Sequence, residues 1–156
     1  MFAKLVQTTV FFLDVLTGAI NPTLAAPLKL AAAKQGLTTG TFTPGVGTTF
    51  ADMTEPSFTG YSQSATIVWG APLNETDGSE TSLSPANLFR ATAVTTPQTI
   101  TGGFVTDGVA APNCGILGSY KLPQTIPIQN PGDGFSAVIG WNMGGSNASS
   151  YAQINQ

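Results

Sequence analysis

The chain has 156 residues, enough for one domain, and an apolar fraction of 42%, enough for a hydrophobic core. Charged residues make up 8%, and a net charge of −3 with five cations excludes a surface that tracks nucleic-acid phosphates. Abundant glycine, proline and threonine favour strands joined by turns. We therefore predict an all-β fold, a single antiparallel β-sandwich or small β-barrel, preceded by an apolar N-terminal arm.

The catalytic inventory is small. There is no histidine, so the commonest general base and metal ligand is missing. Cys114 is the single cysteine, which excludes an intramolecular disulfide and a zinc site built from several cysteines. Without a neighbouring base, Cys114 is interpreted as a buried, unreactive thiol. The composition predicts a structural or binding protein rather than an enzyme, with no catalytic residue, metal ligand or cofactor.

The arm, residues 1–20, is the most apolar part of the chain, and its apolar residues follow neither a helical stripe nor a strict alternation. Two interpretations are open. The segment is an edge strand or short helix on the chain's own core, or it is an arm buried against a neighbouring subunit. No apolar run is long enough to span a membrane, and Thr8, Thr9 and Asp14 interrupt the pattern of a signal peptide.

The next stretch has weak hydrophobic periodicity. Residues 28–33 fit a strand or a short helix opened by Pro27, and the all-β context favours the strand. Residues 36–49 are rich in glycine, threonine and proline and are predicted as a loop. One turn of helix is expected at residues 50–53, ending before Pro56.

Alternation of apolar and polar residues marks the later part of the chain as strands. The first, residues 61–69, places Tyr61, Ile67 and Trp69 on one face. Four more are predicted at residues 87–94, 99–106, 116–122 and 135–141. Strands at this spacing, with turns between them, are typical of a sandwich or small barrel.

Turns and prolines separate these strands. Asp107-Gly108 and residues 130–134 are typical of tight turns, and the second is the strongest turn signal in the chain. Pro123 and Pro127 bracket a short segment that we place at a sheet edge, because proline donates no ladder hydrogen bond.

Three parts follow from these patterns. After the arm, residues 21–145 are expected to form the sandwich or barrel. Residues 146–156 carry no charge and are mostly serine, asparagine and glutamine, so they are predicted as a loose polar tail. No internal repeat is present.

Two groups of oxygen-bearing side chains are candidate sites. Asp52 and Glu55 are close in sequence, but an acid–base pair needs a cleft, and we interpret them as residues of a polar loop. The second group comprises Asn74, Glu75, Asp77 and Glu80. These residues could ligate calcium, yet they lack the spacing of a calcium-binding loop. We interpret them, too, as residues of a polar loop.

Aromatic residues offer another alternative. Trp69 and Trp141, together with Phe58 and Tyr61, could form a platform on which carbohydrate stacks, although aromatics at alternating strand positions are more often core. We predict that both tryptophans are core, with Ile67 and Ile139 on the same faces as Trp69 and Trp141. A glycan-binding protein would leave one tryptophan exposed beside polar side chains.

One stretch resembles a known family. Residues 48–61, Thr-Thr-Phe-Ala-Asp-Met-Thr-Glu-Pro-Ser-Phe-Thr-Gly-Tyr, and residues 68–72, Val-Trp-Gly-Ala-Pro, resemble a motif of small virion proteins encoded near the capsid genes of tailed bacteriophages. Residues 103–107 and the turn that follows Ile126 are also similar. The resemblance covers residues 28–143, and it carries over no catalytic residue.

The resemblance implies a structural protein of the virion: a capsid decoration (cement) protein that binds the outside of the phage head and bridges capsomers. Its expected partners are the major capsid protein and copies of itself, most simply as a homotrimer, with no nucleic acid and no membrane. Its expected location is the capsid surface. The alternative is a short tail fibre or spike subunit that binds host-surface glycan, and a depolymerase is the third possibility. The low charge agrees with the first of these, since many copies can then associate without repulsion.

Overall fold

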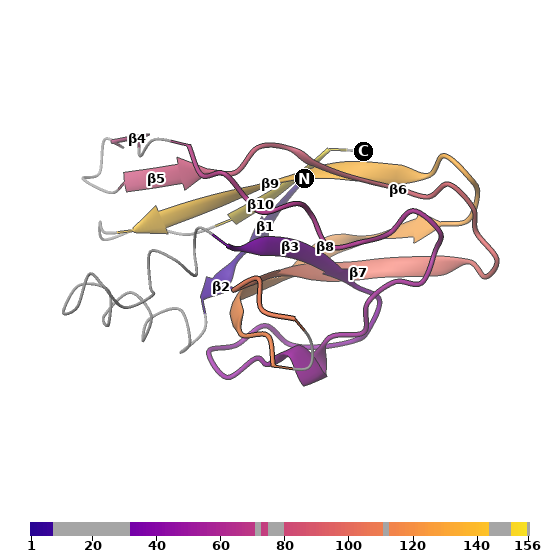
Figure 1. Ribbon diagram of the computed structural model, residues 1–156, viewed down its shortest axis with the longest axis horizontal. Helices are drawn as coiled ribbons and strands as arrows, with labels where there is room; N and C mark the ends of the chain where they lie inside the picture. Colours follow the sequence, from indigo (N-terminus) through magenta and orange to yellow (C-terminus); the bar gives the residue numbers. More distant parts are fainter. Residues whose placement is uncertain (8–31, 71–72, 75–79, 111–112, 144–150, 156) are drawn as a thin grey trace.

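The computed structural model describes residues 1–7, 32–70, 73–74, 80–110, 113–143 and 151–155, and these residues form an all-β fold with one turn of 3-10 helix (Figure 1). The strands are β1 (Phe2–Lys4), β2 (Val6–Gln7), β3 (Lys34–Thr38), β4 (Leu73–Asn74), β5 (Glu80–Leu83), β6 (Asn87–Arg90), β7 (Gln98–Thr106), β8 (Ile116–Ile128), β9 (Gly134–Met143) and β10 (Tyr151–Asn155), and the 3-10 turn is η1 (Phe50–Asp52). The predicted fold class is confirmed.

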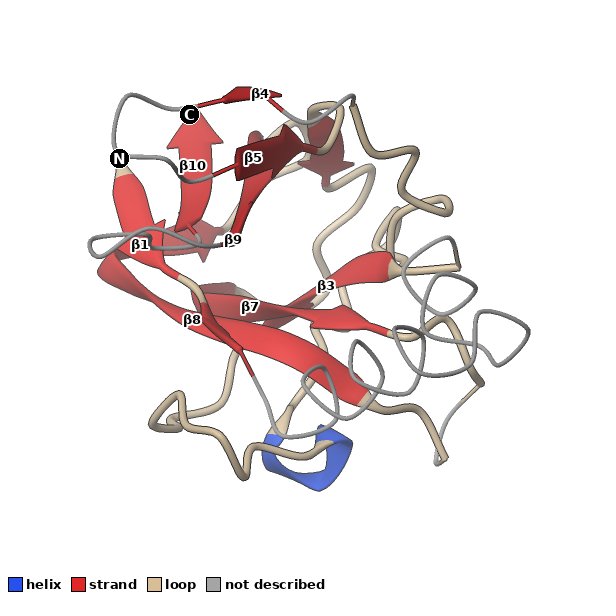
Figure 2. Ribbon diagram, turned by 90° about the vertical axis from the view of Figure 1, so that its left-hand side faces the viewer, coloured by secondary structure: helices blue, strands red, loops and turns tan. Residues whose placement is uncertain are grey.

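The described strands make two antiparallel sheets that pack against each other (Figure 2). Sheet A has the order β1-β10-β9-β5-β4, and β6 also pairs with β9. Sheet B has the order β2-β8-β7-β3. Of the two architectures expected, these strands form the β-sandwich and no closed barrel.

The first seven residues belong to the sandwich itself. β1 pairs with β10 in sheet A, and β2 pairs with β8 in sheet B, so the chain crosses from one sheet to the other at Leu5. Leu5 is 3% exposed and packs in the core. Residues 1–7 therefore fit the first of the two interpretations of the arm, strands on the chain's own core. Residues 8–20 of that arm lie outside the described residues.

The other end of the chain needs correction. Residues 151–155, predicted as part of a loose tail, form β10 between β1 and β9. Ala152 and Ile154 lie at alternate positions and are buried in the core. Pairing with β1 on one side and β9 on the other holds β10 in the sheet, so two buried apolar side chains suffice to anchor this strand. The sequence does not reveal the strand because most of its residues are polar.

Segment 61–70 is not a regular strand. It runs beside β3, but side chains rather than carbonyl groups accept the N–H groups at that edge: Leu37 N donates to the Tyr61 hydroxyl (3.0 Å) and Gln35 N to Ser64 Oγ (2.9 Å). The prediction of a strand at residues 61–69 is wrong for this reason. β3 itself lies partly where a loop was predicted.

The remaining strand predictions agree with the structure. Those at residues 99–106, 116–122 and 135–141 are confirmed as β7, β8 and β9, and the one at residues 87–94 is confirmed over β6. β8 continues through Pro123 and Pro127 to Ile128. η1 confirms the single helical turn, and residues 28–31 of the undecided segment lie outside the described residues.

Residues 130–134 make the predicted turn, between β8 and β9. Gly132 has a φ of 99°, a conformation that glycine adopts without strain. Asp133 Oδ2 accepts the backbone N–H groups of Gln129 and Asn130, each at 2.8 Å, and these bonds hold the pKa of the carboxyl below its usual value. The turn is therefore closed by its own acidic side chain.

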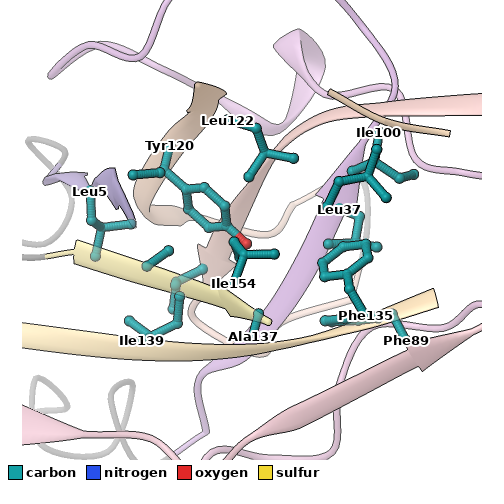
Figure 3. Close-up of a cluster of buried hydrophobic side chains, with 14 of the residues drawn as sticks. Leu5, Leu37, Phe89, Ile100, Tyr120, Leu122, Phe135, Ala137, Ile139 and Ile154 are labelled. Atoms are coloured by element: carbon teal, nitrogen blue, oxygen red, sulfur yellow. The ribbon is translucent and has the colours of Figure 1, made fainter. Parts of the chain in front are cut away.

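The main core fills the space between the sheets (Figure 3). Its labelled members are Leu5, Leu37, Phe89, Ile100, Tyr120, Leu122, Phe135, Ala137, Ile139 and Ile154. Ile67, Ile139 and Trp141 are buried as predicted. Trp69 is half-buried, which corrects its prediction as a core residue: its ring meets that of Trp141 edge-on, with centroids 6.0 Å apart.

A buried amide joins the two sheets inside this core. Gln35, on β3, is fully buried. Its Nε2 donates to the Tyr120 hydroxyl (2.8 Å), and its Oε1 accepts from Asn87 Nδ2 (2.9 Å). Gln35 and Tyr120 belong to sheet B and Asn87 to sheet A, so both ends of the amide are satisfied across the sandwich.

A second, smaller cluster lies on the outer face of sheet B. The ring of Phe104 lies directly over Gly36, because a Cβ on Gly36 would stand 2.3 Å from that ring. Phe50 meets Phe104 edge-on at 5.9 Å, and Met53 is buried beside it. This cluster holds the loop that contains η1 against the sheet.

We expect Trp141→Ala to lower the free energy of unfolding by about 3–5 kcal/mol, the usual range for a buried aromatic side chain. Trp69→Ala should cost less, because part of that ring is already in water. Urea denaturation measures both values. Equal losses for the two variants would contradict the assignment of Trp141 to the core and Trp69 to its margin.

Candidate functional site

The residues of the phage-like motif, 48–61, lie on one loop, which we call the motif loop. It carries η1 against the outer face of sheet B (Figure 2). Asp52 Oδ2 accepts from the backbone N–H of Thr49 (2.8 Å) and from its hydroxyl (3.0 Å). These bonds hold the pKa of the exposed Asp52 carboxyl below its usual value. Asp52 thus caps the helical turn.

The middle of the motif loop is tied to the end of β3. Thr39 N donates to the carbonyl oxygen of Thr54 (2.8 Å), and Thr54 N donates to Thr38 Oγ1 (3.0 Å). Thr38 is fully buried, so this side chain belongs to the fold rather than to a solvent-facing site. The loop therefore continues the edge of sheet B.

Glu55 and Tyr61 close the motif loop on itself. The Tyr61 hydroxyl donates to Glu55 Oε1 at 2.6 Å and accepts from Leu37 N. Burial, and then the hydrogen bond to the Glu55 carboxylate, raise the pKa of Tyr61 well above its usual value. Gln63 Nε2 also donates to Glu55 Oε1 (3.2 Å). The carboxylate is therefore a structural acceptor for two side chains.

Phe58 and Gly60 fix the path of the chain between Glu55 and Tyr61. Phe58 is 4% exposed and meets the Tyr61 ring edge-on at 5.6 Å. Gly60 has a φ of 96°, and a Cβ there would stand 2.7 Å from the carbonyl oxygen of Arg90. A larger residue at position 60 would be strained and would clash with the backbone.

The interpretation of Asp52 and Glu55 as loop residues fits this geometry. Each carboxylate has its own hydrogen-bond donors, Asp52 at η1 and Glu55 at Tyr61. The aromatic residues weighed as a carbohydrate platform do not form one surface either, because Phe58 and Trp141 are buried. Trp69 and Tyr61 are half-buried.

Cys114 lies in the loop between β7 and β8 and is buried. Burial raises the pKa of its thiol to about 11, with the carboxylates of Asp107 and Glu55 adding to the effect. Asp107 itself accepts the backbone N–H of Val109 through Oδ1 (3.0 Å). This environment is the opposite of the electropositive one that activates a cysteine.

In the segments that the structure describes, no three histidine, cysteine, aspartate or glutamate side chains gather as a metal site. Residues 75–79, which contain Glu75 and Asp77 of the weighed calcium group, lie outside those segments. Within the same described segments, no helix is long and apolar enough to cross a membrane.

The structure also shows a surface that sequence reasoning missed. A shallow hollow lies where β6, β9 and β10 meet the turn at residues 130–134, and Arg90 and Leu88 stand on its β6 side. The sequence holds one signal for this surface: Leu88 and Arg90 stand at alternate positions of one strand. The glycine-rich turn that completes the hollow comes about forty residues later in the chain. Pairing of β6 with β9 brings these segments together.

Comparison with known proteins adds no assignment: no protein-family model matches the chain, and no curated protein matches its sequence. What the site can do is therefore argued from the residues of this chain alone. The motif loop organises backbone, carboxylate and aromatic groups into one connected structural unit.

We expect Tyr61→Phe to lower the free energy of unfolding by about 1–3 kcal/mol, because Leu37 N and Glu55 both lose a partner at a half-buried position. Urea denaturation measures the change. The matched control is Ser62→Ala at a neighbouring exposed position, which should stay within about 0.5 kcal/mol of the wild type. A Tyr61→Phe protein as stable as the control would show that the hydroxyl does not hold the loop.

We expect iodoacetamide to alkylate Cys114 of the folded protein at pH 8 about a hundredfold more slowly than a free thiol. With a pKa of about 11, only about one thiol in a thousand is ionised at that pH. The rate should rise about tenfold for each pH unit up to pH 10, because the thiolate is the nucleophile. The protein unfolded in guanidinium chloride is the control, and a rate in the folded protein that levels off below pH 9 would contradict the raised pKa.

Proposed function

We propose that the chain is a structural protein of a tailed-bacteriophage particle, a decoration protein that binds the outside of the head. One observation carries the proposal. The residues that resemble the phage motif are used in the fold: Asp52 caps a turn, Glu55 and Tyr61 close a loop, and Phe58 fills the core. A motif made of such contacts suits a protein that acts through its shape and surface.

The charge of the chain supports the same function. Eight per cent of residues are charged, and the net charge is −3. Copies bound side by side on a shell then repel one another weakly. Large apolar side chains on the described surface are Val46, Val68, Leu88 and Val109. Burial of such side chains against a partner is favourable, and the partners in this proposal are the major capsid protein and further copies of the chain, as a homotrimer.

A second candidate is a short tail fibre or spike subunit that binds host-surface glycan. The half-buried Trp69 favours it, because an aromatic face in contact with water can stack on a sugar ring. Trp141 is buried, so a pair of exposed tryptophans is not presented to a glycan.

The proposal is tested by adding the purified protein to undecorated heads of the phage that encodes it. We expect saturation at hundreds of copies per head, together with a higher temperature of head disruption, since a ligand that binds the intact shell stabilises it. Quantitative gel densitometry and electron microscopy measure copy number and position. A few copies per virion, located at the tail, would contradict decoration. Binding to host cells that Trp69→Ala abolishes would favour the spike.

A further inference from the structure

We draw no further inference here: the strongest candidate, a hollow of about 430 Å³ between residues 41–48 and η1, presents threonine hydroxyl groups, the Phe42 ring and the Asp52 carboxylate, and nothing in the structure shows which ligand would fill it.

Discussion

Two aromatic rings that lie across glycines hold sheet B together on both of its faces. On the inner face, a Cβ on Gly103 would stand 2.4 Å from the hydroxyl oxygen of Tyr120. On the outer face, Phe104 covers Gly36 in the same manner. Glycine in a strand lacks a side chain that packs, and a ring laid over it restores the lost contacts. A Cβ at either glycine would clash with the ring that covers it, so neither position accepts a side chain unless the ring moves.

The contacts of these two rings connect sheet B to sheet A and to the motif loop. Tyr120 extends over β7 to Gln35 on β3, and Gln35 extends to Asn87, so the inner ring starts the polar connection between the sheets. Phe104 also packs with Phe50 and Met53, so the outer ring holds the motif loop. The motif loop is also hydrogen-bonded to β3: the Tyr61 hydroxyl accepts from Leu37 N, and Thr54 N donates to Thr38 Oγ1. Contacts from both faces of sheet B therefore meet at β3, its edge strand.

The strands that could be predicted from the sequence are those whose buried positions are apolar. β9 buries Phe135, Ala137, Ile139 and Trp141 at alternate positions, and the sequence predicts this strand. β3 is not predicted, because its buried side chains include Gln35 and because Gly36 leaves its outer position to a ring from another strand. Segment 61–69 shows alternation without a regular ladder: Ser64 N and Ile67 N donate to the carbonyl groups of Gln35 and Ala33, but side-chain oxygens accept the N–H groups of Gln35 and Leu37.

The candidate site divides in the same way. The local contacts of Asp52 with Thr49 lie within a few residues, so the sequence could indicate a polar loop. The hollow beside Arg90 depends on strands that are far apart along the chain, from Leu88 to Asn155. Its chemistry comes from the register of β6 on β9, and periodicity within one segment carries no information about that register.

The prolines of β8 bear on how the molecule behaves at high local concentration. Beyond Ser119, β8 pairs with β7 on one side, and no described strand pairs with it on the other. A bare strand edge of this kind is a template on which another chain can extend the sheet, the first step of aggregation. Pro123 and Pro127 have no N–H to offer to such a strand. Two positions along this stretch of β8 therefore offer no donor to the sheet of another copy.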